Sequence, residues 1–80
     1  MNASQVAAEL NEYAGASGFT GSGFAAFHRD PETGEFSGGA WFAEGSRPRL
    51  SANDRSFRVR WITDQRYTAA DIEEAFTGGW

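Results

Sequence analysis

The stretch FAAFHRDPETGEFSGGAWF, residues 24–42, decides the fold. Pro31 sets φ for a turn, Asp30 can accept hydrogen bonds from the turn backbone, and Gly34 tolerates positive φ. On both sides of this turn the side chains alternate with the period of two that is typical of strands. The stretch therefore predicts an antiparallel hairpin.

The alternation also predicts which side chains of the hairpin share a face. We expect a register that places His28 opposite Phe36, because a slip by one residue would move every side chain of a strand to the other face. In this register Phe24 and Phe36 lie on the face that packs against the rest of the chain. Phe27 and Trp41 lie together on the opposite face.

Three more elements are predicted around the hairpin. Residues 57–63, FRVRWIT, alternate and predict a third strand. Residues 3–14 carry apolar side chains at helical spacing, and residues 67–76 predict a second helix that begins with the capping pair Thr68 and Asp71.

The bulk composition agrees with one small domain over residues 1–80. The chain has 7 Phe, 3 Trp and 2 Tyr, which can build a core in spite of its length, and it has no cysteine for a disulfide or a thiolate metal site. We expect neither a signal peptide nor a membrane span, because residues 1–10 have no basic stretch followed by an apolar run and no apolar run approaches roughly 20 residues. We expect an α+β fold in which one helix precedes and one follows a three-stranded antiparallel sheet, both on one face, in the order α-β-β-β-α.

No residue set predicts catalysis. The motif GSGFAA, residues 21–26, matches a dinucleotide fingerprint, but that fingerprint needs a strand before it and a helix after it, which is the reverse of the expected order. His28 is the single histidine, without a nucleophile at a characteristic spacing. Asp30, Glu32 and Glu35 lack the calcium-loop pattern. We therefore expect no enzyme activity, no cofactor and no metal.

Charge is distributed unevenly along the chain. The net charge is −4, with −5 on residues 1–46, +4 on residues 47–66 and −3 on residues 67–80. Six carboxylates on the two helices and the hairpin turn could form a negative surface that imitates a nucleic-acid backbone and binds a basic groove: Glu9, Glu12, Glu32, Glu35, Glu73 and Glu74. The ordinary interpretation of such residues is a solvated surface.

The second face of the expected sheet is a further candidate surface. On that face we expect Phe27 and Trp41 beside Arg58 and Arg60. Aromatic and arginine side chains together are typical of protein interface hot spots and also suit stacking on single-stranded bases. Cover by residues 45–56, a homodimer and a foreign partner remain equally compatible with the pattern.

A capped helix, the DPETG turn at residues 30–34, a three-stranded sheet, a closing helix and clustered acids in 80 residues resemble the small phage-encoded anti-CRISPR proteins. The chain is most similar to inhibitors of type I systems, type I-C among them. The resemblance implies an inhibitor without enzymatic activity that binds the Cascade surveillance complex in the cytoplasm of an infected bacterium and blocks target DNA. It also implies a protein partner, no binding of free DNA and no membrane, for a monomer or homodimer, with the six carboxylates facing Lys or Arg.

The basic segment at residues 47–66 supports an alternative. A small nucleic-acid-binding or toxin–antitoxin regulatory protein could use its arginines to contact phosphates. The candidates are Arg47, Arg49, Arg55, Arg58, Arg60 and Arg66.

Overall fold

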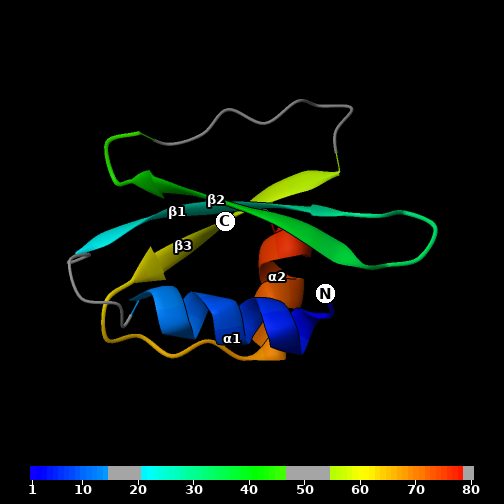
Figure 1. Cartoon of the computed structure of the whole chain (residues 1–80), viewed down its shortest axis with the longest axis horizontal. Helices are drawn as coiled ribbons and strands as arrows, with labels where there is room; N and C mark the ends of the chain where they lie inside the picture. The colour runs from blue at the N-terminus through cyan, green and yellow to red at the C-terminus, as the bar shows by residue number, and fades with distance from the viewer. Residues whose placement is uncertain (15–20, 47–54, 79–80) are drawn as a thin grey trace.

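The computed structural model describes residues 1–14, 21–46 and 55–78, which form a three-stranded antiparallel sheet with two helices on one face (Figure 1). Strand β1 lies between β2 and β3, and both pairings are antiparallel. The elements are α1 (Ala3–Ala14), β1 (Ser22–Arg29), β2 (Phe36–Ala43), β3 (Ser56–Ile62) and α2 (Ala69–Gly78). The predicted α+β fold in the order α-β-β-β-α is confirmed.

Local signals in the sequence explain the turn and the helix starts. Gly34 has a φ of 75°, and its N–H donates to the carbonyl oxygen of Asp30 over 2.8 Å. The N–H of Glu32 donates to Oδ1 of Asp30 over 2.8 Å. At the start of α2, the N–H of Thr68 donates to Oδ2 of Asp71 over 2.8 Å, and the N–H of Asp71 donates back to Oγ1 of Thr68 over 3.3 Å. The predicted capping pair is thus confirmed.

The predicted hairpin register is wrong. His28 lies opposite Ser37, not Phe36, so the pairing next to the turn already differs by one residue from the predicted one. Farther from the turn the register shifts by one more residue, so that Ala26 lies opposite Ala40. The extra residue in β2 is Gly39, whose φ of 122° belongs to the left-handed region that favours glycine. A bulge of this kind changes the side to which the following side chains point.

The bulge turns Trp41 to the face of the sheet that the helices cover. Trp41 pairs with Ala25 and is half-buried, and Phe27 is only 1% exposed in the core. The expectation that Phe27 and Trp41 lie on the opposite face with Arg58 and Arg60 is therefore wrong. Phe24, expected inside, lies instead on the outer face, where it pairs with Arg60.

The core lies between the inner face of the sheet and the two helices. Its largest fully buried side chains come from α1, β1, β3 and α2: Val6, Leu10, Phe27, Val59, Trp61 and Ile72. Tyr67 is buried at the same side, and its hydroxyl donates to the carbonyl oxygen of Arg60 over 2.8 Å and accepts from the N–H of Ile62 over 2.9 Å. The side-chain amide of Asn11 brackets the backbone of Tyr67, accepting from its N–H over 2.7 Å and donating to its carbonyl over 3.1 Å. These bonds hold α1 against the segment that leads into α2.

Candidate functional site

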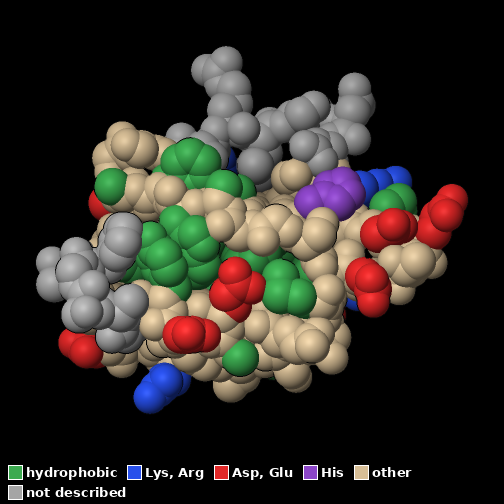
Figure 2. Space-filling model, in the orientation of Figure 1, with side chains coloured by type: hydrophobic (Ala, Val, Ile, Leu, Met, Phe, Trp, Pro, Cys, Tyr) green, Lys and Arg blue, Asp and Glu red, His purple; other side chains and the backbone are tan. Residues whose placement is uncertain are grey.

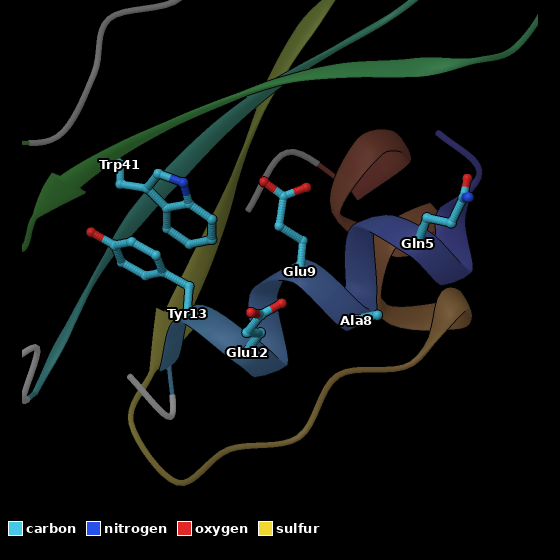
Figure 3. Close-up of a pocket in the computed structure, with 6 residues that line it drawn as sticks. All are labelled: Gln5, Ala8, Glu9, Glu12, Tyr13 and Trp41. Atoms are coloured by element: carbon cyan, nitrogen blue, oxygen red, sulfur yellow. The ribbon is translucent and has the colours of Figure 1, made fainter. Parts of the chain in front are cut away.

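A hollow opens beside α1 and β2, in the region of two contacts that join residues 1–14 to this strand. At the start of α1, the backbones of Met1 and Phe36 exchange two hydrogen bonds of 2.7 Å. At the end of α1, the ring of Tyr13 stacks on the indole of Trp41 with centroids 3.6 Å apart and an interplanar angle of 15°. The space between has a volume of about 610 Å³ (Figure 3), and its lining is Gln5, Ala8, Glu9, Glu12, Tyr13 and Trp41. We call it the α1–β2 hollow.

The ring pair of Tyr13 and Trp41 forms one wall of the hollow and is held in place by buried rings. Tyr13 meets Trp61 edge-on at 5.7 Å, and Trp41 meets Phe27 edge-on at 6.3 Å. Both members of the pair are half-buried, so each presents part of its ring surface to a ligand. Because the core fixes the pair, a ligand does not need to order these side chains when it binds.

The carboxylates of Glu9 and Glu12 extend from neighbouring turns of α1 toward the hollow (Figure 3). Glu9 is half-buried and lies against the bulge, since a Cβ added to Gly39 would come within 3.1 Å of its Oε1. Glu12 is exposed. In the part of the chain that the structure describes, no cation forms an ion pair with either carboxylate. Acidic and hydrophobic side chains accordingly lie side by side on the face that α1 presents (Figure 2).

The helix itself adds to this negative potential. Glu12 lies in the last turn of α1, and no basic side chain is present in that turn. The C-terminal end of a helix carries a partial negative charge, so an uncompensated carboxylate there is unfavourable. The hollow thus combines a stacked aromatic wall with two carboxylates that form no ion pair within the described residues, and it is suited to bind a cationic group.

Other carboxylates predicted as partner-binding are not part of this hollow. Glu32 and Glu35 are exposed at the β1–β2 turn, and Glu74 is exposed on α2. Glu73 forms an ion pair of 3.1 Å with Arg29. The structure therefore brings together Glu9, Glu12 and Trp41 among the predicted site residues and leaves the remaining four acids elsewhere on the surface.

The predicted arginine face exists, but with different aromatic neighbours. Arg58 and Arg60 alternate with inward side chains of β3, and Arg60 lies 5.7 Å from the ring centroid of Phe24. Arg60 also forms an ion pair of 2.6 Å with Glu44. Ile62, at the end of β3, is 38% exposed. The ion pair with Glu44 thus neutralises part of the positive charge on this face. Two of the other candidate arginines, Arg47 and Arg49, lie outside the described residues.

Arg29 has a structural role at the other end of β1. Its guanidinium lies 4.8 Å from the ring centroid of Phe36 and 5.0 Å from that of Phe76, and it holds Glu73 on α2. The arrangement fastens α2 to the sheet through a charge that packs on two rings.

Sequence reasoning did not include Tyr13 among the candidate site residues, because it treated the side chains at helical spacing in residues 3–14 as an apolar face. Glu9, Glu12 and Tyr13 follow one another at helical spacing, which could have shown that they share one side of α1. The position of Trp41 next to them depends on the bulge and could not be obtained from this spacing.

Residues 22–29 form a strand, so GSGFAA does not open a helix as a dinucleotide site would require. Within residues 1–14, 21–46 and 55–78, no three His, Cys, Asp or Glu side chains are grouped so that they could hold a metal ion. No helix in the described residues has the length and apolar character needed to span a bilayer. Comparison of the chain with protein-family models, curated protein sequences and solved structures found no match.

Proposed function

We propose that this protein is a non-enzymatic inhibitor that binds a type I CRISPR surveillance complex in an infected bacterium and blocks its access to target DNA. The α1–β2 hollow is the surface that binds the complex. The observation that carries the proposal is the pair of carboxylates of Glu9 and Glu12, without an ion-pair partner among the described residues, beside the stacked rings of Tyr13 and Trp41.

The chemistry of the hollow fits a protein that normally binds nucleic acid. Surfaces that bind DNA present Lys and Arg side chains to the phosphates. Carboxylates that take the place of phosphates attract the same side chains over a distance and exclude the natural ligand. Tyr and Trp supply rigid contact area and are among the residues most enriched at interface hot spots.

The charges on the other faces favour this function over direct binding of nucleic acid. Arg29 is neutralised by Glu73, and Arg60 is neutralised by Glu44. Phosphate contacts by these arginines would require breaking an ion pair within the chain. The net charge of −4 also opposes association with a polyanion.

The test is an electrophoretic assay of target DNA binding by a purified type I complex, with and without the protein. We expect the protein to prevent DNA binding, and we expect Glu9→Arg/Glu12→Arg to weaken the inhibition at least tenfold. Glu74→Arg, which reverses an exposed charge on α2 outside the hollow, is the control and retains inhibition. Each variant is first checked for helical content by circular dichroism.

Two results would contradict the proposal. One is DNA binding by the complex that is unaffected at a large excess of the protein. The other is binding of the protein itself to free DNA, with an affinity that falls steeply with salt and is lost in Arg58→Glu. The second result would support the nucleic-acid-binding alternative.

A further inference from the structure

We propose that the α1–β2 hollow receives an arginine side chain of the partner protein. This inference rests on the proposed function and names the ligand of the same site. The hollow has a volume of about 610 Å³, within the range of roughly 300–1,000 Å³ that is usual for ligand pockets. It is therefore large enough to admit a whole side chain from the partner's surface.

Charge selects a cation. Glu9 and Glu12 are one turn apart on the same side of α1, where like charges repel each other. Glu9 is half-buried against the backbone of Gly39, which reduces its contact with water and strengthens its attraction to a cation. A single positive group between the two carboxylates would remove the repulsion and compensate the negative end of the helix.

The geometry of the rings selects a planar cation. Tyr13 and Trp41 lie parallel with centroids 3.6 Å apart, so no group can enter between them. A cage for a methylated ammonium needs rings placed around the cation, and this pair does not provide one. A guanidinium can instead lie flat against the exposed ring surface at the side of the pair, which a compact ammonium cannot do.

The number of hydrogen-bond donors points the same way. A guanidinium has five N–H donors in a rigid fork, so it can donate to Glu9 with one edge and to Glu12 with the other while it stacks. The indole Nε1 of Trp41 lies beside Gly39, since a Cβ added to this glycine would be 3.8 Å away. This N–H is a reporter for anything that enters the hollow.

The experiment is a titration of the ¹⁵N-labelled full chain with N-acetyl-arginine amide, followed by the side-chain indole signals in ¹H–¹⁵N correlation spectra. Trp41→Phe assigns the signal of Trp41. We expect this signal to shift and to saturate at millimolar concentrations of the probe. N-acetyl-lysine amide at equal ionic strength is the matched probe, and we expect its affinity to be at least fivefold lower.

Variants test whether the carboxylates hold the probe. We expect Glu9→Gln/Glu12→Gln to lower the affinity for N-acetyl-arginine amide about tenfold or more, because hydrogen bonds to charged groups are the strong ones. Glu74→Gln is the control and leaves the affinity unchanged. Glutamine keeps the size and helix propensity of glutamate, so these variants retain α1.

The outcomes separate this inference from the proposed function. An indole signal of Trp41 that does not move, that moves equally with the lysine probe, or that moves unchanged in the double variant overturns the arginine assignment, even where the CRISPR complex is inhibited. A selective shift that depends on the carboxylates supports the arginine assignment. If the same protein fails to inhibit the complex, only the proposed function is wrong, because the titration contains no CRISPR protein.

Discussion

Replacing Gly23 by alanine tests how closely β1 packs against its two neighbouring strands. Gly23 is buried in β1 and pairs with Trp61 of β3. A Cβ at this position would meet the carbonyl oxygen of Phe42 and would lie 2.6 Å from the nearest ring atom of Trp61. Carbon atoms in contact are normally about 3.5–4.0 Å apart, so the backbone of β2 or the indole must move.

The cost follows from what surrounds the added methyl group. Trp61 is only 2% exposed, so its ring has no free space into which to turn. Overpacking of a well-packed core costs about 1–3 kcal/mol, and an obstacle made partly of backbone favours the upper end. Alanine offsets about 0.5–1 kcal/mol of this loss in the free energy of unfolding, because glycine is unfavourable in a strand. We expect a net loss of about 2 kcal/mol and a melting temperature lower by roughly 8–16 °C, at about 4–8 °C per kcal/mol for a domain of this size.

The assay is urea and thermal unfolding followed by circular dichroism and tryptophan fluorescence. The control is Gly45→Ala, because an added Cβ at Gly45 would have no atom within 4 Å. We expect this control to stay within about 0.5 kcal/mol of the parent. A Gly23→Ala variant as stable as the control would refute the packing of Trp61 on β1 and, with it, the pairing of β1 with β3.

Two further predictions concern titration and the helix end. Burial raises the pKa of Tyr67 above its ordinary value of 10.0, so the unfolded chain loses this proton first, and the free energy of unfolding falls as pH rises above about 10 and is unaffected at lower pH. Urea midpoints measured from about pH 8 to pH 11 should show this fall in the parent and a smaller one in Tyr67→Phe; parallel pH profiles would contradict the assignment. Glu12→Gln should raise the free energy of unfolding by about 0.3–1 kcal/mol because it removes a negative charge from the C-terminal turn of α1, and a lower thermal midpoint would show that Glu12 has a stabilising partner.

The elements of this fold could be predicted because their signals are local. Pro31 and Gly34 specify a turn within a few residues, and Thr68 and Asp71 satisfy each other's backbone N–H groups at the start of α2. Alternation over residues 57–63 correctly placed Arg58 on the outer face, because β3 contains no irregularity.

The hairpin register could not be predicted in the same way. Gly38 and Gly39 have φ of 105° and 122°, but two adjacent glycines in a sequence do not show which of them is an extra residue. Without the bulge, Phe36 and Trp41 would point to opposite faces because they are five positions apart. With it, both point toward the helices, so that Trp41 lies on the same face as Phe27 but on the face opposite to Arg58 and Arg60.

The candidate site shows the same division between local and tertiary information. Each of Glu9, Glu12 and Trp41 was predicted to contact a partner, but the carboxylates and the indole were assigned to two separate surfaces. Helical spacing brings Glu9 and Glu12 to one side of α1 at any position of that helix. Their meeting with Trp41 depends on how α1 docks against the sheet.

From the sequence by itself follow the order of the elements, the hairpin turn, the helix caps and the excess of carboxylates on α1, since each depends on residues close together in the chain. Tertiary structure alone determined that the bulge at Gly39 turns Trp41 inward, that Tyr13 meets it, and that a hollow remains beside two carboxylates. The physical reason is that these contacts join residues far apart in the chain, and their free energy depends on packing that no local pattern encodes.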